Sequence, residues 1–258
     1  MKTALHILKV GGHLVNDAIA LQEVLTAFAG LKGAKLLVHG GGRHATALAK
    51  QLGISPKMVD GRRITDAAML EVAVMSYAGL SNKKIVSQLQ KQGVNAVGLT
   101  GADGNCIEAV KRPVLDIDYG FAGDITQVNT AVFSSLTTQD FVPVLCAITH
   151  DKNGQLLNTN ADTIAAQVAV AMSKAYDVTL FYCFEHAGVL TDINKPDDVI
   201  SLLTKEETEN YTKAGIIHQG MVPKLHNGFD ALNNGVKEVI ISNVAALLDA
   251  NAPKTTLI

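Results

Sequence analysis

The sequence predicts an α/β protein built on an open, mainly parallel central sheet with helices on both faces. Short apolar runs alternate along the chain with longer segments of helical period. Residues 4–10 and 34–40 are expected as buried strands, and the amphipathic segment 17–30 between them as a helix. A strand–helix–strand unit of this kind is typical of parallel sheets with crossover helices.

The same alternation continues to the end of the chain. Helices are expected near 44–52, 129–138, 160–174, 204–213 and 221–234, with two more between 66 and 92 that meet near Gly79. Further strands are expected at 94–101, 141–148, 177–184 and 236–242. Residues 102–128 and 152–154 carry turn signals and predict hairpins. These elements predict one α/β unit in two lobes, roughly 1–175 and 176–258, on one continuous sheet.

Composition narrows the class of protein. Of 258 residues, 48% are apolar and 18% are charged, which is typical of a globular chain. The net charge of −2 argues against nucleic acid and anionic membranes as partners, because both require a basic surface. The three cysteines lack metal-ligand spacing and indicate reduced thiols. The N-terminal apolar stretch is too short for a signal peptide, and no run reaches the ~20 apolar residues of a membrane span, so we expect a cytoplasmic protein.

Two glycine-rich turns follow the first two strands and suggest a site for phosphate. Lys9 lies inside an apolar strand and is followed by Gly11 and Gly12. Gly40, Gly41 and Gly42 precede a helix, whose N-terminal N–H groups attract anions. The alternatives are an edge lysine that reaches solvent and a plain tight turn. The Gly-Lys-Ser/Thr ending of a P-loop is absent.

Three further stretches carry polar residues with two possible interpretations each. In Asn158-Thr159-Asn160-Ala161-Asp162, the asparagine at 160 can cap a helix, or the aspartate can hold two lysines in place. Lys224 begins a helix after Gly220-Met221 and is either a solvated surface lysine or part of the site. Arg62 and Arg63 form either a surface pair or a carboxylate-binding group.

Together these motifs resemble the amino acid kinase family, and their order is similar to that of members acting on N-acetylated glutamate. The resemblance covers nearly the whole chain and includes Gly61-Arg62-Arg63-Ile64-Thr65 and Gly120-Phe121-Ala122-Gly123-Asp124. It implies an α/β/α sandwich and transfer of the γ-phosphoryl group of ATP to the side-chain carboxylate of N-acetyl-L-glutamate, in arginine biosynthesis. Mg²⁺ would be carried mainly by the phosphates, with few or no protein ligands.

The resemblance also implies roles for individual residues. Lys9 and Lys224 would flank the transferring phosphoryl group, and Asp162 would orient both lysines. Substrate binding would fall to Gly41, Gly42, Arg63, Asn158 and Asn160, in the lobe formed by 1–175. Nucleotide binding would fall to Gly11, Gly12, Glu185, Gly188, Gly220 and Met221, with 176–258 as the ATP lobe. The loop 182–189 departs from the family pattern, and Glu185 would replace its usual aspartate.

The resemblance leaves alternatives open for substrate and assembly. N-succinyl-L-glutamate is the rival acceptor, and a non-catalytic metabolite sensor is the rival from another class. Hexameric, arginine-inhibited members carry a helix before the first strand, whereas this sequence reaches Lys9 at once. We therefore expect a homodimer that arginine does not inhibit by that route.

Overall fold

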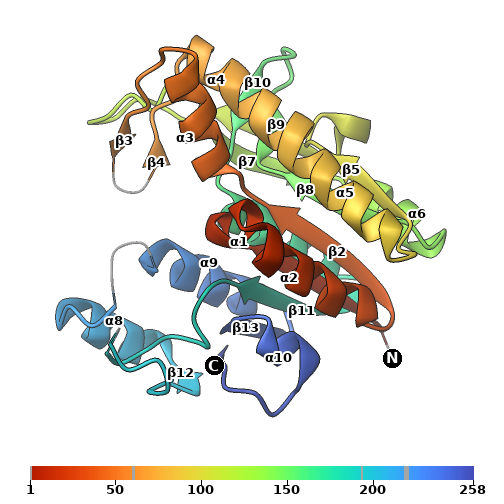
Figure 1. Cartoon of the computed structure of the whole chain (residues 1–258), viewed down its shortest axis with the longest axis vertical. Helices are drawn as coiled ribbons and strands as arrows, with labels where there is room; N and C mark the ends of the chain where they lie inside the picture. The colour runs from red at the N-terminus through yellow and green to blue at the C-terminus, as the bar shows by residue number, and fades with distance from the viewer. Residues whose placement is uncertain (1, 60–61, 193, 218–220) are drawn as a thin grey trace.

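An eight-stranded sheet runs through the centre of the computed structural model, which describes residues 2–59, 62–192, 194–217 and 221–258 (Figure 1). Its strand order is β12-β14-β13-β11-β1-β2-β8-β5. The strands are β1 (Thr3–Val10), β2 (Ala34–His39), β5 (Ala96–Leu99), β8 (Val142–Cys146), β11 (Tyr176–Cys183), β12 (Leu202–Leu203), β13 (Glu238–Ser242) and β14 (Thr255–Leu257). All neighbours pair in parallel except β13 and β14, so the prediction of a mainly parallel sheet is confirmed.

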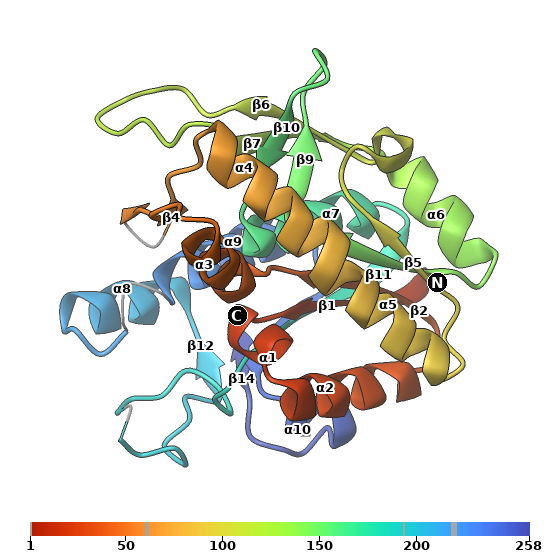
Figure 2. The ribbon, with the colours of Figure 1, turned by 45° about the horizontal axis from the view of Figure 1, so that its top comes forward.

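Helices cover both faces of this sheet, as predicted. One face carries α1 (Gly12–Asn16), α2 (Ala18–Gly30), α5 (Asn82–Lys91) and α10 (Ala245–Leu248). The other carries α3 (Gly42–Gln51), α4 (Ala67–Val74), α6 (Thr130–Thr138), α7 (Ala161–Ser173) and α9 (Val222–Asn233). Figure 2 shows α2 and α7 on opposite sides of the strands. Among the described residues, no helix combines the length and apolarity needed to cross a membrane.

The core divides between the two faces because strand side chains alternate in direction. Ile7 of β1 belongs to the apolar cluster on the α7 side, whereas Leu8 belongs to the cluster on the α2 side. Local sequence signals fix the helix ends: Asp17 caps α2, and Thr204 with Glu207 forms a capping box on α8 (Lys205–Lys213).

A second, four-stranded sheet packs beside the first and bears part of the site. Its order is β10-β9-β6-β7, formed by β6 (Ile107–Lys111), β7 (Gly123–Val128), β9 (Ile148–His150) and β10 (Leu156–Asn158). The antiparallel pairs β6/β7 and β9/β10 are the predicted hairpins. The single strand expected over 141–148 is wrong, since the chain leaves β8 at Ala147 and enters this second sheet as β9.

The helical segment 67–91 also differs from expectation. Instead of two helices meeting near Gly79, one continuous run passes from α4 through a π-helical turn, Met75–Ser81, into α5. Such π turns are frequent at functional sites, and Tyr77 of this turn packs against Gly41. The sequence did not predict several elements that are too short to give a periodic signal. They are α1, α10, β12, β14, the 3₁₀ turn Asp103–Asn105 and the antiparallel pair β3 (Met58–Val59) and β4 (Arg62–Arg63).

The cysteines are free thiols, as predicted. Cys106, Cys146 and Cys183 are all buried, and burial raises the pKa of each thiol to about 12. A thiol with such a pKa is protonated at neutral pH and reacts poorly.

Gly120 lies between β6 and β7 and packs against Thr65, just before α4. A substitution there tests this contact. The φ of Gly120 is +67°, and a Cβ there would lie 2.7 Å from the carbonyl carbon of Thr65. Gly154 has a similar φ, +82°, with nothing within 4 Å of the added Cβ. Gly154→Ala should therefore cost only the left-handed strain of about 1 kcal/mol. Gly120→Ala should lower the free energy of unfolding by about 3 kcal/mol or more, because backbone must move. Urea denaturation measures both, and equal losses would contradict the assigned contact.

Candidate active site

Lys9 is the charged residue of an otherwise apolar strand, and the strand's alternation sets its direction. It follows Leu5 and Ile7 on the same face of β1, so its side chain points toward α7. Its strand neighbours in register are Val38 on β2 and Tyr182 on β11. The ammonium group therefore lies at the carboxyl end of the central strand, where parallel sheets bind ligands.

Asp162 joins this lysine to a second one from the far end of the chain. The Nζ atoms of Lys9 and Lys224 lie 2.7 Å and 3.0 Å from the same carboxylate oxygen, Oδ1 of Asp162. All three side chains are largely buried, with exposed fractions of 9%, 10% and 15%. Both α7 and α9 contribute their first turns here. The three side chains form a rigid cluster with one net positive charge, which we call the lysine cluster.

Asp162 stays ionised despite its burial. Burial by itself would raise the pKa of Asp162, but the attraction of Lys224 and then of Lys9 holds it well below its usual range. Burial lowers the pKa of Lys224, with Asp162 acting in the opposite direction.

The hydroxyl of Tyr182 donates to the Asp162 main-chain carbonyl at 3.2 Å, and Lys224 Nζ sits 5.1 Å from the centre of that ring. The cluster is thus positioned by three separate elements.

Of the three glycines in the second turn, Gly41 is required for space. Gly41 is the N-cap of α3, and a Cβ on it would meet Tyr77 Cδ1 at 2.5 Å. Gly42 opens the helix, and its carbonyl accepts a hydrogen bond from Arg63. The turn therefore presents main-chain groups and a helix N-terminus, which suits an anion.

The first glycine turn differs in part from expectation. Gly12 begins the short helix α1, and nothing lies within 4 Å of an added Cβ there. The N–H of Gly11 donates to the Cys183 carbonyl at 2.8 Å, so this amide pairs with the sheet, and a role for Gly11 in nucleotide binding stays a prediction. A Cβ on Gly11 would lie 3.2 Å from the same carbonyl oxygen, which explains the glycine by close packing.

A cleft of about 200 Å³ adjoins the lysine cluster on the side of the glycine turn. It brings together five residues expected from sequence: Gly41, Gly42, Arg63, Asn158 and Asn160. The remaining lining residues are Gly40, Met58, Arg62, Tyr77, Arg112, Ala122, Gly123, Ala147, Thr159 and Ala161. Its size and lining suit a small polar metabolite.

Arg63 and Asn158 are held in place within this cleft. One guanidinium nitrogen of Arg63 donates to the Gly42 carbonyl and to the Thr46 hydroxyl, both at 2.8 Å. The amide nitrogen of Asn158 donates to the Thr65 hydroxyl at 3.0 Å. Gly61, part of the same motif as Arg63, lies outside the described residues.

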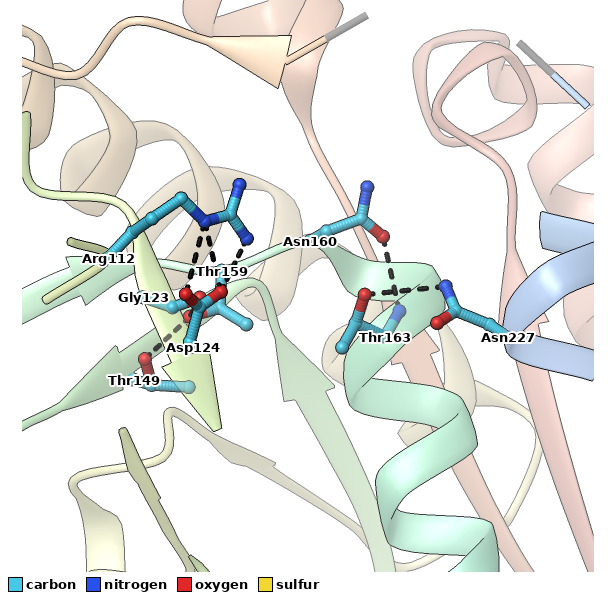
Figure 3. A network of polar contacts seen from close by, with 8 residues as sticks. All are labelled: Arg112, Gly123, Asp124, Thr149, Thr159, Asn160, Thr163 and Asn227. Carbon is cyan, nitrogen blue, oxygen red and sulfur yellow. Dashed lines mark hydrogen bonds and ion pairs between the residues drawn. The ribbon is translucent and has the colours of Figure 1, made fainter. Parts of the chain in front are cut away.

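Both interpretations that the sequence left open for this segment are present, since Asp162 contacts the two lysines and Asn160 caps the helix. The side-chain oxygen of Asn160 caps α7 by accepting from the N–H groups of Asp162 at 2.8 Å and Thr163 at 3.1 Å. Its amide nitrogen points away from the helix (Figure 3). Asn227 of α9 donates to the Thr163 hydroxyl at 3.3 Å and so links α9 to the start of α7.

Arg112 is a cleft residue that sequence reasoning missed. Its guanidinium lies against Asp124, with Nε 3.1 and 3.2 Å from the two carboxylate oxygens (Figure 3). Asp124 follows Gly123, whose carbonyl accepts from Thr159 at 3.3 Å. The opposite charges of Arg112 and Asp124 are visible in the sequence, but the β6/β7 register that joins them is not.

The residues expected to bind nucleotide are less closely gathered. Gly188 and Met221 line a small hollow of about 50 Å³ with His186, Phe184 and four aliphatic residues. Gly188 packs so tightly that a Cβ would meet Val199 Cγ1 at 2.5 Å. Glu185 is exposed, and Gly220 lies outside the described residues. His186 is half-buried, and its ring packs edge-on against that of Phe184 with the ring centres 5.6 Å apart.

Comparison with known proteins identifies the class. A model of the amino acid kinase family matches residues 5–243, and the chain belongs to this family. The acetylglutamate kinase of Phocaeicola vulgatus is 54% identical over 247 residues, covering 96% of each chain. That of Bacteroides thetaiotaomicron is 53% identical over 249 residues, covering 96% of this chain and 97% of its own. In fold, the chain is similar to N-acetylglutamate synthase from Neisseria gonorrhoeae (TM-score 0.80, 23% identity), covering 99% of this chain and 59% of that one.

Asp162→Asn tests the lysine cluster through stability. The change leaves two buried ammonium groups without a counter-charge and should lower the free energy of unfolding at pH 7 by about 3 kcal/mol. Because the folded pKa of Asp162 lies below its unfolded value, its stabilisation is complete above about pH 5 and is lost as pH falls. The gap between wild type and variant should shrink by about 1.4 kcal/mol per pH unit below about pH 4. Urea unfolding at several pH values measures this, with Asp230→Asn on the surface of α9 as control. A gap independent of pH would contradict the ion pairs.

Proposed function

We propose that this chain is an ATP-dependent kinase that phosphorylates the side-chain carboxylate of N-acetyl-L-glutamate, giving N-acetylglutamyl 5-phosphate in arginine biosynthesis. The observation that carries the proposal is the lysine cluster, in which one buried carboxylate holds two ammonium groups beside an anion-binding glycine turn. Relatives at 54% and 53% identity that are acetylglutamate kinases support the same reaction.

The chemistry explains why such a cluster is needed. The acceptor carboxylate is already ionised at neutral pH, so the reaction requires no general base. The obstacle is repulsion between an anionic nucleophile and a polyanionic phosphate donor, which positioning and fixed positive charge relieve. Lys9 and Lys224 would stabilise the transferring phosphoryl group from two sides. Asp162 would keep both lysines in place.

The cleft would hold the acceptor. Arg63 and Asn158 would bind the carboxylate that does not react, and the N–H groups of Gly41 and Gly42 would approach the one that does. Asn160 would add its free amide nitrogen. We assign Arg112, beside Ala122 and Gly123, to the same wall of the cleft, where its partnership with Asp124 makes it a hydrogen-bond donor with a compensated charge.

ATP would bind to the lobe formed by 176–258, with its phosphates directed at Gly12 and the lysine cluster. Gly188 and Met221 would contact the nucleotide through the small hollow that they line. Mg²⁺ would be held mainly by the phosphates, because Asp162 already accepts both lysines. Within the described ranges, no group of three or more His, Cys, Asp or Glu side chains forms a metal cluster. Glu185, Gly220 and the homodimer stay predictions.

The acetyl acceptor is favoured over the two alternatives. The relatives named above are acetylglutamate kinases, which disfavours the N-succinyl acceptor. A sensor without catalysis would have no need of two lysines held at 2.7 and 3.0 Å from one carboxylate oxygen. The intact lysine cluster supports an enzyme.

Lys9→Met and Lys224→Met test the phosphoryl-transfer role. Each should lower kcat by about 10²- to 10³-fold, because one fixed charge is lost from the transition state. The KM for ATP should change less than about fivefold, since many other groups hold the nucleotide. A coupled assay of ADP release measures both constants, with the exposed Lys237→Met as control. Full turnover in either variant would disprove the roles given to these lysines.

Arg63→Lys tests the acceptor site. Lysine cannot reproduce the planar fork of arginine, so the KM for N-acetyl-L-glutamate should rise by about 10- to 100-fold. The KM for ATP, measured at saturating acceptor, should stay near the wild-type value. Arg43→Lys, on the exposed side of α3, is the matched control. An effect confined to the KM for ATP would place Arg63 with the nucleotide instead.

A further inference from the structure

His39 is a fully buried imidazole for which the proposed reaction has so far supplied no role. It is the last residue of β2 and directly precedes the glycine turn. Its ring lies between that turn and α5, where it contacts the main chain of Gly40 on one side and Asn82 on the other. A buried polar ring in this position needs both of its nitrogens satisfied.

The hydrogen bonds around His39 determine which ring nitrogen carries the proton. The amide nitrogen of Asn82 lies 2.9 Å from the Val144 carbonyl and 3.1 Å from His39 Nε2. It must donate to the carbonyl, and Lys83 donates to the Asn82 side-chain oxygen at 3.1 Å, which fixes the orientation of the amide. The Nε2 atom therefore accepts. The proton sits on Nδ1, which donates to the Gly40 carbonyl at 2.7 Å.

The neutral form of the ring is maintained by its surroundings. Burial lowers the pKa of His39 to about 4, and the nearby charge of Lys83 acts in the same direction. A proton on Nε2 would also face the donor of Asn82. At neutral pH the ring is therefore uncharged, and its single N–H is the one directed at Gly40.

This bond fixes the orientation of a peptide plane in the glycine turn. In a trans peptide the carbonyl of Gly40 and the N–H of Gly41 point in opposite directions. A carbonyl held toward His39 thus turns the Gly41 N–H away from it, and Gly41 lines the cleft. Glycine has no side chain to limit rotation of this plane, so an external constraint is needed.

We propose that His39 is a positioning residue: held in its Nδ1–H form by Asn82, it fixes the Gly40 carbonyl and so aims the Gly41 N–H at the reacting carboxylate. This inference rests on the proposed function, because it assigns the purpose of a donor in the acceptor cleft. Asn82 belongs to the same device. Its side chain reaches the ring because residue 98, on the neighbouring β5, is a glycine whose added Cβ would overlap Asn82.

Two substitutions separate positioning from packing. His39→Asn keeps an N–H donor near the place of Nδ1, whereas His39→Gln keeps a polar group near Nε2 and loses that donor. His39→Gln should lower kcat with N-acetyl-L-glutamate by about 10²-fold, the effect of losing one oriented main-chain donor. His39→Asn should retain kcat within about fivefold of the wild type, and the KM for ATP should be unchanged in both. His150→Gln, in the second sheet, serves as control. Equal losses in the two variants, or none in either, would overturn the proposal.

A measurement on the unmodified chain guards against variants that fail to fold. Nitrogen-15 NMR of labelled wild-type protein at pH 7 should show a proton on Nδ1 of His39 and none on Nε2. The opposite tautomer would overturn the proposal. If the wild type releases no ADP with N-acetyl-L-glutamate, the proposed function fails, and the aim of Gly41 at that carboxylate is overturned with it. If the wild type is active, the tautomer and the two variants test the positioning role of His39 independently of the proposed function.

Discussion

One buried carboxylate, that of Asp162, sets the arrangement on which the site depends. Two ammonium groups at the carboxyl end of the sheet would repel each other. Burying each without a partner would cost several kcal/mol. Asp162 accepts both through a single oxygen and leaves one net positive charge. Because Lys9 comes from β1, Asp162 from α7 and Lys224 from α9, the same contact also connects the first strand to the last third of the chain. The ion pairs of Asp162 therefore both compensate the charge of the lysines and connect β1, α7 and α9.

The glycines around this cluster matter mainly for the space that they leave. Gly41 admits the ring of Tyr77, and Gly11 admits the Cys183 carbonyl. In neither place is the backbone left-handed, so the requirement is close approach and not an unusual φ. The π-helical turn that carries Tyr77 joins α4 to α5 and packs against the glycine turn, and Tyr77 itself lines the cleft. Packing by this ring therefore supports the main chain of the glycine turn.

The cleft beside the lysine cluster combines segments that are distant in sequence. Arg63 comes from a two-residue strand and is fixed by the first turn of α3, while Asn158 ends a strand of the second sheet. Arg112 reaches the same cleft from the β6/β7 hairpin and is held by Asp124. Since each side chain is anchored by a neighbour, the cleft presents donors in fixed directions, which favours binding of a small anionic metabolite.

The sequence alone was sufficient for the fold class and for most helices and strands, and the family resemblance of its motifs implied the lysine cluster. Periodicity reports local structure, and motifs report residue types whose chemistry is distinctive. It could not decide between a helix cap and an ion pair for Asn160-Ala161-Asp162, whereas the structure contains both, with Asn160 as the cap and Asp162 as the partner of the lysines. The sequence also missed Arg112, the contact of His39 with Gly40, and the hydrogen bond from Gly11 to the Cys183 carbonyl. Each of these depends on strand register or on side chains brought together from separate elements. Only the tertiary structure determines such contacts, because pairing across a sheet leaves no local periodic signal.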